Sequence, residues 1–474
     1  MSNLKYFIFL FFIFYTSYLF AENNIILNGH QNKYNIGSKI LVLEDETKLL
    51  NVQDILSKKH SHNFTKSKSD IPNYGFTESS FWFKFSVFNE SINNDYIIEF
   101  AWPLYDLIEI YTYRDNSYNK LYETGDIKPF KNRTIIHRNF IFPFKVNTKS
   151  SIYFLIHISS KDSIQLPITI WEEDSFNNHS RNVEWLYGIY FGIITVMLLY
   201  NLFIFLSIKD ITYFYYIIFL LTHIIFQLTY YGFGYEFIWP ESPFLQNHML
   251  QFSIGIAISF PLLFTNSFLH LKSSYPILSK LFIMLFIMTC TFSLYTLFSD
   301  EIKNNLIVMN ILSFLYSVLI FITSIISLIN GNKSARFFLL AWFTLLFGVL
   351  IIVLKNTGIL PNNQISSNAL IFGSAFEVTF LSLALADKIN NMKAEKESAQ
   401  EEVITIQKNY TESLEKTVHE RTHELQDRNK IMEHEIALAR KIQDKLIPER
   451  TPANYISAIY EPMEEVGGDF YDFI

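Results

Sequence analysis

The chain has 474 residues, of which half are hydrophobic, 17% are aromatic and only 18% are charged. Soluble proteins average about 25% charged residues, so this composition excludes a mostly disordered chain and favours long apolar segments, and the length allows roughly three domains. The net charge of −7, without a block of basic residues, argues against nucleic acid as a partner, and the single cysteine, Cys290, excludes an intrachain disulfide or a cysteine-rich zinc site.

The first 21 residues have the pattern of a secretory signal. A lysine precedes the apolar run 6–14, and small and polar residues follow as far as Ala21. A basic residue, an apolar stretch and a small residue at the cleavage point are typical of a signal peptide. Leu19 occupies a position where a small residue is preferred, so an uncleaved N-terminal anchor is the alternative. Both arrangements place residues 22–182 outside the cytoplasm.

Residues 22–182 contain short runs in which apolar and polar residues alternate, and residues 81–88 are an example. Runs of this period, rich in Phe, Ile and Tyr and bounded by Asn, Ser, Gly and Pro, are typical of strands. We therefore expect an all-β sandwich.

Aromatic rings and a guanidinium suit stacking on sugars or pairing with anions, and several such side chains lie in this region. The candidate ligand contacts are Trp82, Trp102, Tyr105, Arg133 and Trp171. The alternative is that the aromatic side chains fill the core of the sandwich. The position of Trp82 between two phenylalanines favours this alternative for that residue.

Seven apolar runs follow between residues 183 and 386. Runs of about 18 or more apolar residues with few charges are candidates for transmembrane helices. The predicted spans are 185–208, 211–231, 246–269, 277–298, 306–329, 336–354 and 367–386. The first, third and fifth connections, with their edges, contain five Lys or Arg residues, against two in the other connections. Because short loops rich in Lys and Arg stay in the cytoplasm, we expect the N-terminus outside and the C-terminus inside.

Two polar residues are notable within the predicted spans. Glu377 lies near the middle of the seventh span, where an ionisable group costs at least ~2.5 kcal/mol on insertion scales. Asn201, in the first span, is one candidate partner for it, and His223, Gln227 and His248 are the others. A role in function and a packing role through a hydrogen bond to a neighbouring helix both remain open.

A highly charged segment without glycine or proline covers residues 387–447. Every seventh residue in its second half is apolar, namely Val418, Leu425, Met432, Ala439 and Leu446. This heptad repeat is typical of a coiled coil, so we expect a signalling helix that forms a homodimer. Four extra residues before Val418 predict a stutter, which locally unwinds such a pair of helices.

The sandwich and the spans resemble a known receptor family. GFTESSFWFKFSVFN, which starts at Gly75, resembles part of the extracellular sandwich of bacterial seven-transmembrane receptors with diverse intracellular signalling modules (7TM-DISM). LLYNLFIFLSIKDITYFYY, around Asn201, resembles the first helix and cytoplasmic turn of that family, and GSAFEVTFLSLALADKI resembles its last helix. The resemblance implies a jelly-roll-like sandwich, a small-molecule or carbohydrate ligand, and a location in the bacterial inner membrane.

The final residues resemble the start of an enzyme domain. EIALARKIQDKLIPERTP and YEPMEEVGGDFYDFI are similar to the opening of bacterial PPM-type serine/threonine phosphatases of the sporulation and stress-response class. The resemblance implies two Mn²⁺ or Mg²⁺ ions, which prefer oxygen ligands and activate a water for attack on a phosphoserine or phosphothreonine. The matching metal-site positions are Asp469, Asp472 and the backbone carbonyl of Phe470, with Gly467 and Gly468 allowing close approach.

The predicted layout therefore has five parts. They are a signal peptide (1–21), a sandwich sensor domain (22–182), a seven-helix membrane domain (183–386), a coiled-coil helix (387–447) and the first part of an α/β phosphatase sandwich (448–474). We interpret the chain as a receptor that relays ligand binding to the phosphatase module, whose substrate by family analogy is an anti-sigma-factor antagonist phosphoprotein. The other acidic ligands of such a site are not among these residues, so we expect no activity and no stable ion binding from them alone.

Two other functions are considered. The first is a binding receptor without catalysis, which recruits or regulates a homologous phosphatase by dimerisation. The second is transport, which is the weakest, because transporters have internal repeats and broken helices while Pro261 is the only proline inside a predicted span.

Overall fold

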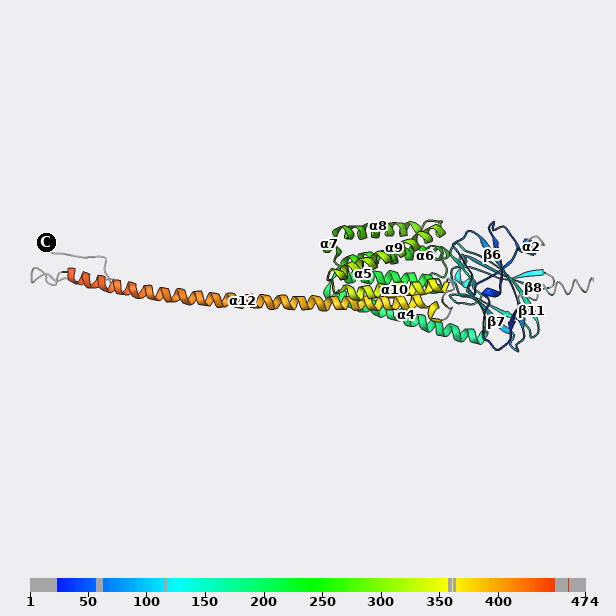
Figure 1. The fold of residues 1–474 in the computed structure, drawn as a ribbon, viewed down its shortest axis with the longest axis horizontal. Coiled ribbons are helices and arrows are strands. Elements are labelled where there is room, and N and C mark those ends of the chain that lie inside the picture. The colour runs from blue at the N-terminus through cyan, green and yellow to red at the C-terminus, as the bar shows by residue number, and fades with distance from the viewer. Residues whose placement is uncertain are drawn as a thin grey trace, which may run out of the picture. The chain divides into compact units, whose positions relative to one another are not determined.

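The computed structural model describes residues 24–56, 63–114, 117–356, 360, 364–447 and 459. The chain divides into two compact units, Met1–Lys388 and Ile389–Ile474. The first unit contains a β-sandwich and a helical bundle, and the second contains the continuation of the last helix (Figure 1). The predicted signal peptide (1–21) and the predicted metal-site residues Gly467, Gly468, Asp469, Phe470 and Asp472 lie outside the described residues.

The sandwich is built from two main sheets and one small sheet. The larger sheet has the order β4-β3-β6-β11-β8-β9, with β1 added in parallel to β6, and the smaller one has the order β10-β7-β13-β2. The strands of the larger sheet are β1 (Asn24–Leu27), β3 (Leu41–Asp45), β4 (Thr65–Lys66), β6 (Ser80–Asn89), β8 (Leu107–Arg114), β9 (Ser117–Thr124) and β11 (Ser151–Ser159). Those of the smaller sheets are β2 (Lys33–Asn35), β7 (Asp95–Phe100), β10 (Phe140–Lys145) and β13 (Ile168–Glu172), and β5 (Asn73–Gly75) with β12 (Ile164–Gln165).

The central strand β6 shows why the sequence forms this sandwich. Alternate residues such as Phe81, Phe83 and Phe85 point into the core between the two main sheets. The residues between them face the other way, and there Trp82 packs in a second apolar cluster and stacks on His157 with ring centroids 4.5 Å apart. The strand is therefore buried on both faces, which explains its nearly continuous apolar sequence. The predicted all-β sandwich is confirmed, and Trp82 occupies a core position.

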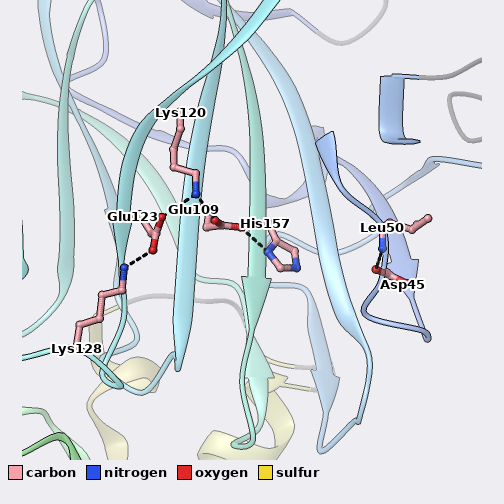
Figure 2. Close-up of polar contacts among 7 residues, drawn as sticks. All are labelled: Asp45, Leu50, Glu109, Lys120, Glu123, Lys128 and His157. Atoms are coloured by element: carbon pink, nitrogen blue, oxygen red, sulfur yellow. Dashed lines mark hydrogen bonds and ion pairs between the residues drawn. The ribbon is translucent and has the colours of Figure 1, made fainter. Parts of the chain in front are cut away.

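Charged side chains connect three neighbouring strands on the face of the larger sheet that is turned away from the core (Figure 2). Glu109 on β8 accepts hydrogen bonds from Lys120 on β9 at 2.6 Å and from His157 on β11 at 2.9 Å. Lys120 also binds Glu123 at 2.7 Å, and Glu123 binds Lys128. The hydrogen bonds from His157 and Lys120 lower the pKa of Glu109 to about 2. This network holds the edge of the sheet together.

The bundle contains seven long helices in the described part of the chain, each apolar enough to cross a bilayer. They are α4 (Glu173–Ile208), α5 (Ile211–Tyr230), α6 (Pro243–Phe268), α8 (Pro276–Thr296), α9 (Ile302–Ile329), α10 (Ala335–Asn356) and α12 (Ala369–Leu446). Each predicted span corresponds to one of them. The first helix begins at Glu173 rather than at residue 185, because its first turns pack on the sandwich, where Phe176 contacts Trp171.

The last helix, α12, continues far beyond the bundle as one unbroken helix. Residues 387–447 contain neither glycine nor proline, so nothing in the sequence ends the helix there. Ion pairs four residues apart support it, for example Lys393 with Glu397 and Lys416 with Glu420. The predicted seventh span and the predicted signalling helix are therefore parts of the same element.

The substitution Glu109→Gln should lower the free energy of unfolding by about 1–3 kcal/mol, because hydrogen bonds to charged groups contribute roughly that much when they are shielded from water. The pKa of Glu109 in the folded protein lies below its usual 4.5, so this stabilisation is present above pH 4.5 and is lost as the pH falls toward 2. Thermal unfolding of the whole protein in nanodiscs should show a larger difference between wild type and variant at pH 5 than at pH 3.

A matched variant is Glu123→Gln. The carboxylate of Glu123 is more exposed than that of Glu109, so its loss should lower the free energy of unfolding by less. An effect of Glu109→Gln that is the same at both pH values would contradict the role given to the ionised carboxylate.

Candidate functional site

The sandwich contacts the bundle through an apolar cluster and a loop. Leu104 of the sandwich packs against Leu250 on α6 and Leu306 on α9. The backbone N–H of Phe130 donates to the carbonyl of Pro240 at 2.8 Å, in the connection between α5 and α6. Through these contacts the sandwich packs on α6, α9 and the connection between α5 and α6.

Arg133, a predicted ligand contact, holds this loop from inside. Its guanidinium is buried, donates to the carbonyls of His137 at 2.9 Å and Arg138 at 2.6 Å, and lies 4.1 Å from the ring centroid of Phe140. Burial lowers the pKa of Arg133 to about 10. The structure therefore gives Arg133 internal partners.

The predicted aromatic contacts have different positions. Tyr105 is fully buried in the sandwich core and donates its hydroxyl to the carbonyl of Gln165. Trp171 is also buried and donates its indole N–H to Glu99 at 2.9 Å. Trp102 differs from both, because it lines a cavity at the base of the sandwich.

This cavity has a volume of about 430 Å³ and lies where the sandwich meets the bundle. Its walls come from the sandwich and from α5, α6, α9, α10 and α12, and most of the wall residues are apolar or aromatic. Asp162 lines the part formed by the sandwich, and burial together with the nearby Asp106 raises its pKa to about 8. Mostly apolar cavities of this size with a few polar groups are typical of small-molecule sites.

Glu377 lines the same cavity within the bundle, and only 1% of its surface is exposed. His223 and Gln227 on α5 line the cavity with it, as does Ser374 on α12. The hydroxyl of Tyr190 on α4 connects two of these residues, at 3.1 Å from His223 Nε2 and 2.9 Å from Ser374 Oγ. Among the described residues, none donates a hydrogen bond to the Glu377 carboxylate.

The structure brings two of the four expected partners into the cavity with Glu377. These are His223 and Gln227, whose side chains are 3.3 Å apart. His248 instead contacts the carbonyl of Phe244, one turn earlier on α6. Asn201 is buried but bonds elsewhere, as described next.

Buried polar side chains form a line of contacts that fastens α12 to its neighbours. Tyr216 on α5 donates to the carbonyl of Val378 at 2.7 Å and lies 3.1 Å from Ser382 Oγ. Tyr213, three residues earlier, donates to the carbonyl of Leu385 at 2.9 Å. Asn201 on α4 donates to Ser382 at 3.1 Å. We call these contacts the α12 seam. These two tyrosines were not predicted from the sequence, although their spacing of three residues places both on one face of the helix.

Ion pairs mark the point where α12 leaves the bundle. Lys388 Nζ is 3.6 Å from Oδ2 of Asp210, which lies in the connection between α4 and α5, and 3.2 Å from Oγ1 of Thr212 in the first turn of α5. Asp210 also caps α5 by accepting a hydrogen bond from the backbone of Thr212 at 2.8 Å. On the preceding residue of α12, Asp387 accepts a hydrogen bond from Arg336 of α10 at 2.7 Å. The seam and these pairs together attach α12 to its neighbours from Val378 to Lys388.

Comparison with known families agrees with this architecture. Residues 184–388 match the family model described as 7TM diverse intracellular signalling, and residues 37–172 match the one described as 7TMR-DISM extracellular 2. No curated protein matches the chain. The chain is thus a multi-pass membrane protein with an extracellular β domain and a seven-helix membrane domain. Both matched models are of the 7TMR-DISM type, which supports a 7TM-DISM receptor and a role in transmembrane signalling.

The substitution Tyr216→Phe should weaken the α12 seam. Hydrogen bonds between membrane helices contribute ~0.6 kcal/mol on average and at most ~1.7 kcal/mol, and we expect the free energy of unfolding to fall within that range. The measurement is unfolding of the purified protein by increasing fractions of sodium dodecyl sulfate. Tyr200→Phe, on the exposed face of α4, is the control and should change nothing. Equal effects of the two variants would be evidence against the seam.

Proposed function

We propose that this protein senses a small extracytoplasmic ligand and transmits its binding, through α12, to a PPM-type serine/threonine phosphatase module in the cytoplasm. The observation that carries the proposal is the continuity of α12. The same helix provides Ser374 and Glu377 to the cavity and extends to Leu446. In this proposal, a change at the cavity that rotates or shifts α12 is passed along one continuous helix.

The α12 seam suits such a movement. Tyr213 and Tyr216 donate to backbone carbonyls of α12, and a helix presents a carbonyl at every residue. A small rotation or shift of α12 exchanges one acceptor for another, so the buried hydroxyls stay bonded in both positions. Two arrangements of similar free energy are what a switch requires.

We also propose that the cytoplasmic part of α12 pairs with α12 of a second copy. Its heptad residues are largely exposed in the single chain, for example Val418 at 56% and Leu425 at 61%. Burying such a repeated apolar stripe requires a partner helix with the same repeat, and a parallel homodimer provides it.

The Lys and Arg residues of the short connections support an orientation with this helix in the cytoplasm and the N-terminus outside the bacterial inner membrane.

Pairing of α12 is tested by disulfide cross-linking in membranes. In a protein whose only native cysteine is replaced, Cys290→Ser, the substitution Leu425→Cys should give a disulfide-linked dimer under mild oxidation. Asp427→Cys, two residues further and outside the apolar stripe, is the matched control and should give at least about tenfold less. Equal cross-linking at the two positions would contradict the proposed register.

The phosphatase output rests on resemblance alone. In it, Asp469 and Asp472 with the carbonyl of Phe470 would hold two Mn²⁺ or Mg²⁺ ions, and Gly467 and Gly468 would allow their close approach. Carboxylate and carbonyl oxygens are suitable ligands for these ions. The chemistry they supply is activation of a water for attack on a phosphoprotein, for which an anti-sigma-factor antagonist is the proposed substrate.

The output is tested by measuring Mn²⁺-dependent release of phosphate from a phosphoserine peptide. The sample is the membrane-embedded protein with any coding sequence that follows Ile474. Asp469→Asn should reduce the rate at least about 100-fold, because it removes a bridging metal ligand. Asp444→Asn, an exposed residue of α12, should leave it unchanged. Activity that survives Asp469→Asn would contradict the metal role, and no activity in any sample would favour a receptor that recruits a separate phosphatase.

A further inference from the structure

We propose that the cavity between the sandwich and the bundle binds a hydrophobic amine, with its ammonium group against Glu377 and its apolar body among α5, α6, α9 and α10. The inference rests on the proposed function only for the role of this amine as the signal. The binding site itself is argued from the cavity and can be tested by binding alone.

The walls select the body of the ligand. Ile254, Ile320 and Leu346 are among the aliphatic residues that line the cavity, together with aromatic residues from several helices. A saccharide would leave most of its hydroxyl groups without partners against these walls, and each such group is costly to bury. An apolar or aromatic body of small-molecule size gains free energy from the same burial.

The charge of the walls selects the head group. Within the bundle the cavity is lined by one carboxyl group, Glu377, and the wall residues of the whole cavity, all within the described part of the chain, include no lysine or arginine. The one histidine of the wall, His223, already contacts Tyr190 and Gln227. A buried carboxylate is stabilised by a positive partner, and these walls provide none to Glu377. A cationic ligand would be the positive partner of Glu377.

A second acceptor in the same cavity favours an ammonium group in particular. Gln227 is 1% exposed, lines the cavity, and its side-chain oxygen has no hydrogen-bond partner among the described residues. An ammonium carries three N–H donors and no acceptor, so it suits a cavity whose polar groups include a carboxyl and an unpaired amide oxygen. The indole N–H groups of Trp102 and Trp342 on the walls also lack partners, which favours a body with a hydrogen-bond acceptor such as an ether oxygen.

The experiment measures equilibrium binding of radiolabelled 2-phenylethylamine and 2-(4-methoxyphenyl)ethylamine to the full chain in nanodiscs. The matched neutral and anionic compounds are 3-phenylpropanol and 3-phenylpropanoate. We expect saturable binding of the amines, at least tenfold tighter than that of the alcohol, and no binding of the anion. Equal binding of amine and alcohol, or no saturable amine binding, would overturn the proposal.

Variants locate the site. Glu377→Gln keeps the shape of the side chain and should weaken amine binding at least tenfold while leaving alcohol binding unchanged. Ser313→Leu fills the cavity from α9 and should weaken both. Glu301→Gln, at an exposed position just before α9, is the matched control and should bind like wild type. Unchanged amine affinity in both Glu377→Gln and Ser313→Leu, with thermal unfolding showing folded proteins, would place the amine elsewhere.

The outcomes separate this inference from the proposed function. Amine binding that depends on Glu377 but leaves phosphate release and α12 cross-linking unchanged supports the site and counts against the relay. Amine-dependent changes in α12 that persist in Glu377→Gln support the relay and overturn the site.

Discussion

A polar side chain buried in a membrane bundle has no water to bond, so it must find its partner on its own helix or on a neighbouring one. For four such side chains of α4 and α5, the partner lies on α12. Tyr190, Asn201, Tyr213 and Tyr216, all buried, bond the side chains or carbonyls of α12. These bonds decide which face of α12 is turned inward, and that face carries Glu377. The position of the carboxyl in the cavity and the attachment of the output helix therefore have the same physical cause.

The cavity connects the two halves of the first unit. One wall of the cavity belongs to the sandwich and the other walls belong to the bundle, so an occupant contacts both. The sandwich is held in place by the buried guanidinium of Arg133, which organises the loop resting on the α5–α6 connection, and by the packing of Leu104 on α6 and α9. Because these contacts fix the position of the sandwich, we propose that a ligand bound in the cavity displaces the helices, and α12 is the helix that continues past the bundle.

Much of the fold was predictable because simple physical rules determine it. Bilayer thickness sets the length of an apolar helix, which is why all seven spans were found. Alternation in this region indicated a sandwich, and the two phenylalanines that flank Trp82 indicated that its side chain is buried. Less was predictable about the site. Hydropathy does not determine the order of helices around a bundle. The structure places His223 and Gln227 in the cavity with Glu377, while His248 and Asn201 make their contacts elsewhere. Residue type alone did not reveal that Tyr105 and Arg133 have internal partners.

The central claim is that occupancy of the cavity at Glu377 moves α12. The most direct measurement is the distance between spin labels at two exposed positions, Ile277→Cys on α8 and Leu383→Cys on α12, in a protein with Cys290→Ser. The account predicts that 2-phenylethylamine shifts the distance distribution in this protein and has no such effect when Glu377→Gln is added. Identical distributions with and without bound amine, at concentrations that saturate the site, would contradict it.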